Sequence, residues 1–183
     1  MALYNMLLVG GYDFGVVHVN YMMRGEESES ETKALIDLLK EKGIRYFASY
    51  IDGTLFSGNF QTKARESRYN FFSDIMAEED YDALLTGHHK DDFLETYLMQ
   101  EHSKRQTFYH GIKEEVQLNG IKVLRPLLGY YKDDLLKYCH ENSVPYAIDS
   151  SNLETKYTRN KIRHNILMTM SVTEKDKLFN KVT

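Results

Sequence analysis

Leu85-Thr86-Gly87-His88-His89-Lys90-Asp91-Asp92-Phe93-Leu94-Glu95-Thr96 is the stretch of the sequence that says most about the fold. The apolar residues of 81–85 predict a buried strand, and the apolar spacing that begins at Phe93 predicts a helix over 92–101. Two histidines and two aspartates therefore lie at a strand-to-helix turn. Folds of the α/β class place ligands at such turns, so the sequence predicts a reactive site here.

The same residues also have a purely structural interpretation. Asp91 or Asp92 could be the helix N-cap, with Glu95 as its capping-box partner, because a side-chain oxygen there satisfies a backbone N–H. A cap needs one aspartate and explains neither the second one nor the paired histidines. We therefore take Asp91, Asp92 and His89 as candidate catalytic residues.

Strands and helices alternate in the first hundred residues. Strand-like runs at 14–20, 44–51 and 81–85 are followed by helical patterns over 28–42, 62–77 and 92–101. This alternation predicts an α/β fold in which a parallel sheet is flanked by helices.

The later part of the chain changes pattern. Residues 116–124 predict a small β-hairpin around Asn119-Gly120, which we interpret as an insertion and a candidate lid. Helical patterns follow over 131–142 and 157–170, and the polar end 171–183 is interpreted as a linker or a helix fragment.

Composition excludes several classes of protein. The chain has 183 residues, which suits one domain, and its net charge of −4 gives no general basic surface for nucleic acid. No apolar run approaches the roughly 20 residues of a membrane span, and no signal peptide is recognisable, so the sequence predicts a soluble cytoplasmic protein with no membrane partner. The lone Cys139 excludes an internal disulfide and a multi-cysteine zinc site.

Basic residues recur at helical spacing. Arg159 and Arg163 are four positions apart and share a helix face, where two guanidinium forks would match phosphate oxygens. Arg65 and Arg68 are three apart on an earlier helical pattern. Each pair taken alone is equally well a solvated basic face.

Several motifs, in order along the chain, carry a resemblance to a known family. They are His18-Val19-Asn20 with Arg24-Gly25-Glu26-Glu27, the run Ala64 to Tyr69, Thr86 to Asp92 with Glu95-Thr96, Arg125-Pro126-Leu127-Leu128, and Asp149 to Asn152 with Tyr157 and Arg159 to Arg163. Over about residues 16–166 the sequence resembles the tRNA(Ile)-lysidine synthetase family.

The resemblance implies an N-type ATP-pyrophosphatase domain of the PP-loop superfamily, with an adenine nucleotide alpha hydrolase-like, Rossmann-like fold. Such ligases use ATP and Mg²⁺ to activate C2 of the wobble cytidine in tRNA(Ile) with a CAU anticodon by adenylation. L-lysine then displaces AMP and gives lysidine, which changes decoding from methionine to isoleucine.

The resemblance also implies residue roles. Asp91 and Asp92 would bind Mg²⁺ and the activated cytidine, and His89 or Asp92 would accept the proton of lysine. The remaining candidates are basic residues, with ATP or phosphate assigned to His18, Arg24, Arg159 and Arg163, and tRNA or substrate assigned to Arg65, Arg68, Arg125 and Asn160.

The sequence departs from the family in its glycine-rich loop. The motif Ser-Gly-Gly-x-Asp-Ser, whose amides cradle pyrophosphate, is missing, and Gly10-Gly11 is a poor substitute because no adequate strand precedes it. We expect residues 1–8 to form the helix that follows this loop, with Gly10-Gly11 as the turn into the next strand. On this interpretation residues 1–170 are the ATP-pyrophosphatase domain without its first strand, 171–183 begin a linker to absent domains, and the chain alone is inactive.

Three other functions stay open. A tRNA thiolation enzyme of the same superfamily would need more cysteines. A metal-dependent phosphohydrolase could use the His88 to Asp92 cluster, and a degenerate binding module would keep the fold without catalysis. The sequence does not decide whether the chain forms a homodimer.

Overall fold

The computed structural model describes residues 1–56, 58–103, 108–146 and 158–182. Within these residues the chain forms two compact units. The first unit holds residues 1–5, 85–116 and 124–183, and the second holds 6–84 and 117–123. The motif at 149–152 and Tyr157 lie outside the described residues.

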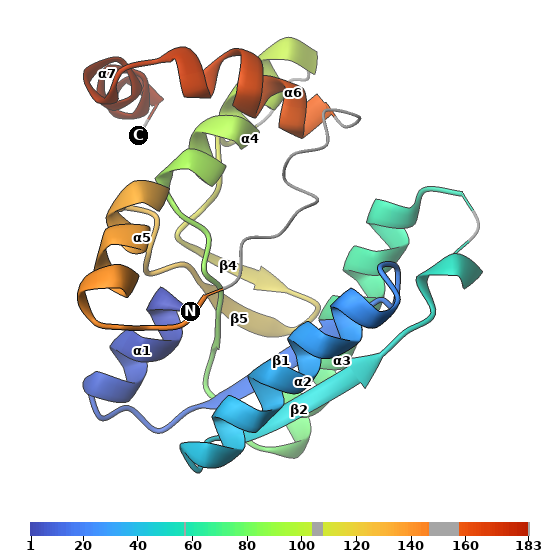
Figure 1. The fold of residues 1–183 in the computed structure, drawn as a ribbon. Coiled ribbons are helices and arrows are strands. Elements are labelled where there is room, and N and C mark those ends of the chain that lie inside the picture. The colour runs from blue at the N-terminus through green and yellow to red at the C-terminus, as the bar shows by residue number, and fades with distance from the viewer. Residues whose placement is uncertain (57, 104–107, 147–157, 183) are drawn as a thin grey trace. The chain divides into compact units, whose positions relative to one another are not determined.

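A parallel strand pair is the centre of the second unit (Figure 1). Its elements are β1 Gly15–Asn20, α2 Glu26–Glu41, β2 Arg45–Tyr50, the 3-10 turn η1 Gly53–Leu55 and α3 Phe60–Glu78. β1 and β2 run parallel, with Val17 opposite Phe47. The α2 crossover between them is the unit expected when two parallel strands are neighbours, and it confirms the predicted alternation.

The first residues form a helix, as the sequence predicted. α1 spans Ala2–Val9, and Gly10 and Gly11 make the turn that follows it before β1. Gly11 has a φ of +68°, a conformation that glycine adopts without steric cost. Gly10-Gly11 is therefore a turn after a helix and not a phosphate loop after a strand.

A second sheet has three short strands in the order β3-β5-β4, namely β3 Leu84–Leu85, β4 Glu115–Leu118 and β5 Ile121–Leu124. The predicted hairpin is confirmed, because Asn119 and Gly120 both have positive φ, the signature of a tight two-residue turn. The lid interpretation is wrong: β5 is the central strand of its sheet, and Val123 is fully buried.

Helices dominate the first unit. They are α4 Lys90–Ser103, α5 Lys132–Glu141, α6 Thr158–Asn165 and α7 Val172–Val182, with the 3-10 turn η3 Leu167–Thr169 between the last two. The expected single helix over 157–170 therefore ends early, because Ile166 has non-helical angles of φ −121° and ψ −64°.

A buried apolar cluster joins α4, η3 and α7. Phe93, Leu94, Leu128 and Leu167 form its core, and α7 adds Leu178, Phe179 and Val182 to it. The end of the chain is thus a packed helix, which is the helix alternative that the sequence left open for 171–183. Figure 1 shows α7 beside α4.

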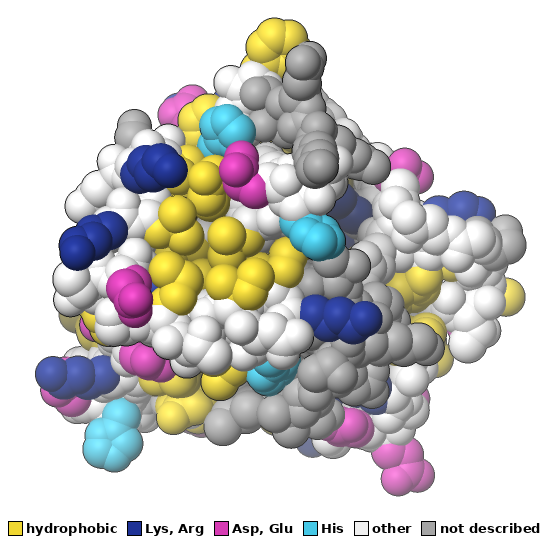
Figure 2. All heavy atoms as spheres, turned by 90° about the horizontal axis from the view of Figure 1, so that it is seen from above, with side chains coloured by type: hydrophobic (Ala, Val, Ile, Leu, Met, Phe, Trp, Pro, Cys, Tyr) yellow, Lys and Arg dark blue, Asp and Glu magenta, His cyan; other side chains and the backbone are white. Residues whose placement is uncertain are grey.

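Apolar side chains remain exposed near α6 and α7. Ile166, Met168 and Val172 are 42, 66 and 61% exposed. Figure 2 shows a hydrophobic area on the face of the molecule that is seen from above. Across the described residues, no helix combines the length and the apolar character needed to cross a membrane.

Candidate active site

The candidate catalytic residues lie at the N-terminus of α4. His89, Asp91 and Asp92, together called the acidic cluster below, belong to the first turn or the residue before it. An Asp92 carboxylate oxygen accepts a hydrogen bond from the backbone N–H of His89 at 3.0 Å, and Lys90 N–H donates to Tyr130 O at 2.8 Å. These bonds satisfy N–H groups that a helix start leaves unpaired, and the acids suit the helix dipole.

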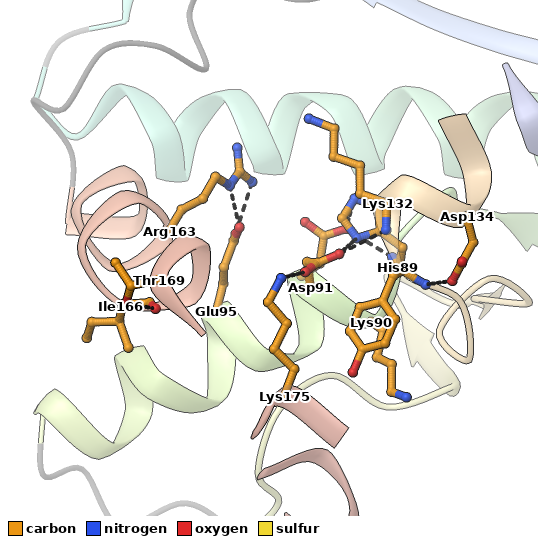
Figure 3. A network of polar contacts seen from close by, with 12 residues as sticks. His89, Lys90, Asp91, Glu95, Lys132, Asp134, Arg163, Ile166, Thr169 and Lys175 are labelled. Carbon is orange, nitrogen blue, oxygen red and sulfur yellow. Dashed lines mark hydrogen bonds and ion pairs between the residues drawn. The ribbon is translucent and has the colours of Figure 1, made fainter. Parts of the chain in front are cut away.

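Asp91 is held at both carboxylate oxygens. Oδ2 accepts from the backbone N–H of Lys132 at 2.9 Å, so Asp91 caps α5, and Oδ1 accepts from Lys175 Nζ on α7 at 2.9 Å (Figure 3). Burial alone would raise the pKa of Asp91, but these two hydrogen bonds and the charges of Lys175 and His89 hold it below its ordinary value. Asp91 is therefore an ionised side chain that joins three helices.

His89 lies between the two carboxylates. Its Nε2 is 3.4 Å from Asp92 Oδ2 and its Nδ1 is 3.7 Å from Asp91 Oδ2. The Nδ1 atom is buried and makes no hydrogen bond to any residue that the structure describes. An imidazole in this position could exchange a proton with Asp92 or with a molecule bound beside it.

Lys90 and α7 extend this network. Lys90 Nζ pairs with Asp176 at 2.6 Å and lies 4.5 Å and 4.6 Å from the ring centroids of Tyr131 and Phe179. Tyr131 donates its hydroxyl to the same Asp176 at 2.8 Å. Burial, with Asp176 as a second cause, raises the pKa of Tyr131, so this phenol stays protonated.

Glu95 and Arg163 form a buried pair one turn further along α4. Glu95 is fully buried, and Arg163 donates to it with Nε and, at 3.1 Å, with Nη2 (Figure 3). The hydrogen bond that Arg163 donates to Glu95 is the main reason why the pKa of Arg163 is raised, and the charges of Glu95, Asp92 and Asp91 contribute to the same shift. Glu95 is therefore the partner of α6, and its suggested capping-box role is wrong.

His18 and Arg24 lie in the second unit. His18 Nε2 is 3.0 Å from Thr32 Oγ1, and burial lowers the pKa of His18, so its imidazole is neutral at pH 7. Arg24 pairs with Glu27 at 3.1 Å and Glu31 at 2.6 Å. Both candidates are engaged with α2 in this state.

Arg65 and Arg68 lie on α3, also in the second unit. Their guanidinium carbons are 4.7 Å and 5.9 Å from the ring centroid of Tyr69, which is buried. Burial raises the pKa of Tyr21, and the charge of Arg68 opposes that shift. Arg65 is exposed.

Arg125 is a buried side chain in the first unit. It is 5% exposed and donates to Lys113 O at 2.6 Å, while its Nε has no hydrogen-bond partner within the described part of the chain. The Arg125 guanidinium therefore fixes the backbone of the segment before β4 and is not a cation on the surface. The side chains of Arg159 and Asn160 lie outside the described residues.

Sequence reasoning missed the residues that α7 and α5 bring to the acidic cluster. Lys175, Asp176 and Tyr131 all contact it or its neighbour Lys90. The sequence contained one indication of this helix. Leu178, Phe179 and Val182 have helical spacing, which predicts an apolar face on an otherwise polar segment.

The parallel α/β unit and the carboxylates at a helix start define a ligand-binding α/β domain, and comparison with known proteins makes the class specific. The chain belongs to the PP-loop domain family, whose model matches residues 1–170.

Its relatives include enzymes with one name. The chain is 41% identical over 155 residues to the tRNA(Ile)-lysidine synthase of Bacillus licheniformis. The aligned residues cover 82% of this chain and 33% of that protein. It is 36% identical over 152 residues to the tRNA(Ile)-lysidine synthase of Mycoplasma pneumoniae, covering 82% and 52% of the two chains. The chain thus spans between a third and about half of the length of these relatives.

A solved structure supports the fold. The U34-tRNA thiolase NcsA from Methanococcus maripaludis, with its [4Fe-4S] cluster, matches 92% of this chain and 62% of that one at a TM-score of 0.63 and 16% sequence identity. At this identity the likeness shows a shared fold and nothing about the reaction.

Proposed function

We propose that this chain is part of a tRNA(Ile)-lysidine synthase. In the proposed reaction ATP adenylates the oxygen at C2 of the wobble cytidine of tRNA(Ile) with a CAU anticodon, with release of pyrophosphate, and L-lysine then attacks C2 and displaces AMP. The observation that carries the proposal is the acidic cluster at the N-terminus of α4, within a chain that aligns with relatives of that name. A tRNA substrate also favours a cytoplasmic protein, and a homodimer remains part of the proposal to be tested.

The residues fit a magnesium ion in one particular way. Mg²⁺ is commonly held by one or two carboxylates together with phosphate oxygens of a substrate. We assign Asp92 and Asp91 to an Mg²⁺ carried by ATP; in this structure Asp91 accepts hydrogen bonds from Lys132 N–H and Lys175, and Asp92 accepts one from His89 N–H. When bound, the ion would supply positive charge where pyrophosphate leaves.

Proton transfer is assigned to the neighbours of that carboxylate. The α-amino or ε-amino group of lysine is cationic in water and must lose a proton before it attacks carbon. His89, with its buried Nδ1 and with Nε2 3.4 Å from Asp92, is the proposed acceptor. Arg163, fixed by Glu95, supplies a fixed positive charge on the same unit.

The nucleotide and RNA contacts are proposed from the second unit and α6. His18, Arg24 and Arg159 are proposed to act on ATP or its phosphates, and Arg65, Arg68 and Asn160 on the tRNA. For Arg125 we propose an indirect role, because its guanidinium is buried against Lys113. Arg24 would have to exchange Glu27 or Glu31 for phosphate.

The alternatives gain no support. Among the described residues no group of three or more His, Cys, Asp or Glu could hold a metal ion, so nothing there favours a phosphohydrolase. The thiolase resemblance concerns the fold alone.

A chimera tests the function. Residues 16–182 would replace the corresponding segment of the Bacillus licheniformis relative, which supplies the rest of that longer protein. We expect ATP-dependent incorporation of labelled lysine into a tRNA(Ile) transcript, with lysidine identified by mass spectrometry. Asp92→Asn should lower this rate at least 100-fold, and Lys137→Ala, an exposed change on α5, should leave it unaltered.

A folded chimera that makes no lysidine would refute the proposal. The 183-residue chain alone contains no Ser-Gly-Gly-x-Asp-Ser loop, so we expect no lysidine from it. Lysidine formation by the chain alone would contradict this second expectation and leave the first intact.

A further inference from the structure

Arg125 is a buried arginine whose positive charge is not balanced by any carboxylate of a described residue. The residue is 5% exposed, and no acidic side chain in the described part of the chain pairs with it. Arginine keeps its charge inside a protein, and burial of a charge costs free energy unless an opposite charge and hydrogen bonds compensate for it. A small anion bound beside this guanidinium would supply that compensation.

The hydrogen bonds of Arg125 involve only one side of its guanidinium. Nη1 donates to the backbone carbonyl of Lys113 at 2.6 Å. Nε has no partner among the described residues, and Nη2 donates to none of them either. Nε and Nη2 lie side by side in the guanidinium plane, and two such N–H groups match the two oxygens of a carboxylate. The remaining donors are therefore arranged for one planar oxyanion.

Arg125 follows a strand whose end meets the strand that leads to the acidic cluster. Arg125 comes directly after β5, and Thr86 comes directly after β3, the neighbouring strand in the sheet. Thr86 N–H donates to Leu124 O at 3.0 Å, so the carboxyl ends of the two strands adjoin. Ligands of α/β folds bind beyond the carboxyl ends of strands, and Arg125 is attached at such an end.

The surroundings of Arg125 favour a small group with one negative charge over a polyphosphate or an RNA backbone. A polyanion is bound by several cations on an accessible surface. Here Lys113 contributes its carbonyl, whereas its ammonium lies 5.4 Å from the ring centroid of Tyr109. One buried guanidinium is balanced by one carboxylate.

We propose that Arg125 binds the α-carboxylate of the amino acid substrate, L-lysine. The inference rests on the proposed function, because lysine is the amino acid that this reaction consumes. A carboxylate held by Nε and Nη2 fixes one end of the lysine molecule and leaves the ε-amino group at the other end free. The indirect role of Arg125 in RNA binding uses Nη1 and the backbone of Lys113, so the two roles involve different atoms.

Nuclear magnetic resonance on the 183-residue chain tests the proposal without any substitution. The Arg125 Nε–H resonance is followed in separate titrations with L-lysine, with inorganic phosphate and with cadaverine, which is lysine without its carboxyl group. We expect L-lysine to shift this resonance to saturation, because Nε then donates to a carboxylate, and the other two probes to leave it unchanged. No response to L-lysine, or an equal response to cadaverine or phosphate, would overturn the proposal.

A substitution of Arg125 tests the same contact by calorimetry. Arg125→Lys keeps the charge and loses the two-donor edge, so we expect L-lysine to bind about ten-fold more weakly than to the wild type. Arg45→Lys is the matched control, because Arg45 is 61% exposed, and its lysine affinity should stay within about two-fold of the wild type. Unchanged affinity in an Arg125→Lys chain that is folded by circular dichroism would refute the contact, and the wild-type titrations decide if this variant does not fold.

The chimera separates a lysine contact from a phosphate contact. Arg125→Lys should raise the KM for L-lysine about ten-fold and leave the KM for ATP within about two-fold, a difference that a general loss of structure would not produce. An equal or larger rise in the KM for ATP would contradict the proposal. If the chimera makes no lysidine, lysine binding by the 183-residue chain still decides this inference, so its failure and that of the proposed function are distinguishable.

Discussion

Asp91 and Asp92 are neighbours in the sequence, yet they have different surroundings in the fold. Asp91 binds the backbone of α5 and the ammonium of Lys175, and Asp92 accepts the N–H of His89. The residue that looks most like a metal ligand by its position is thus mainly a junction between helices. We therefore expect substitutions of Asp91 and Asp92 to affect the stability of the fold differently.

Asp91→Asn is expected to lower the free energy of unfolding at pH 7 by about 2 kcal/mol, because charge-assisted hydrogen bonds are lost at a mostly buried site. The folded-state pKa of Asp91 is depressed, so its contribution is present above the unfolded pKa of about 3.9 and is lost as the pH falls through the lower folded pKa. The gap between wild type and variant should therefore hold from pH 7 to 5 and close in stronger acid.

Urea titrations at several pH values measure this gap. Asp133→Asn, an acid in the exposed first turn of α5, is the control and should change stability by less than about 0.5 kcal/mol. A gap that widens as the pH falls would contradict the role given to Asp91.

The pair of Glu95 and Arg163 should respond asymmetrically to substitution. Arg163→Met leaves a fully buried carboxylate without this partner and is expected to cost about 3–5 kcal/mol. Glu95→Gln leaves a guanidinium that is 22% exposed and can reach water, so about 1–2 kcal/mol is expected. Denaturant unfolding of both variants and of the double variant measures the coupling, and the reverse order of costs would show that the pair is not buried as described.

Sequence reasoning found the residues of the site that are close together in the chain and missed those that are not. His89, Asp91 and Asp92 fall within four positions, so composition alone reveals them. Lys175 reaches Asp91 across 84 positions and Arg163 reaches Glu95 across 68, and no local pattern encodes such contacts. The sequence predicted Arg163 as a phosphate-binding cation, but its pairing with Glu95 became visible only in the folded structure.

At the level of elements, α7 is the part of the chain whose role changed most. Its polar composition suggested a linker, whereas Leu178, Phe179 and Val182 pack against the core of the first unit. Hydrophobic content averaged over the segment hides this, because one helical face carries the apolar residues. The strands and helices with clear period, such as β1, α2 and the hairpin, were predicted correctly.

Phe179→Ala is expected to destabilise the chain by about 3 kcal/mol, because it removes an aromatic ring packed on Phe93 and Lys90. Val172→Ala, on the same helix but 61% exposed, is the control and should cost less than about 0.5 kcal/mol. Amide hydrogen exchange should also speed up along α7 in Phe179→Ala. Unchanged exchange and stability would mean that α7 is not docked through this ring.

At the scale of the whole molecule, the amount and distribution of positive charge determine how strongly the chain can bind RNA phosphates. The net charge is −4, and on the face shown in Figure 2 the Lys and Arg side chains are spread around a hydrophobic area instead of gathering. A protein of this kind binds a polyanion through few local cations. The first half of α3 offers such a group, with Lys63, Arg65 and Arg68 against the single acid Glu66.

Arg65→Ala is therefore expected to weaken binding of a tRNA(Ile) transcript and to reduce the slope of log affinity against log salt by about 0.7–0.9, the value for one lost phosphate contact. Fluorescence anisotropy between low and moderate KCl concentrations measures both quantities. Lys137→Ala is the matched control, because this lysine is 75% exposed and pairs only weakly, at 3.8 Å, with Glu141. If both variants lower the slope equally, binding is diffuse and α3 is not the RNA contact, whereas a change confined to Arg65→Ala would locate the electrostatic part of recognition on α3.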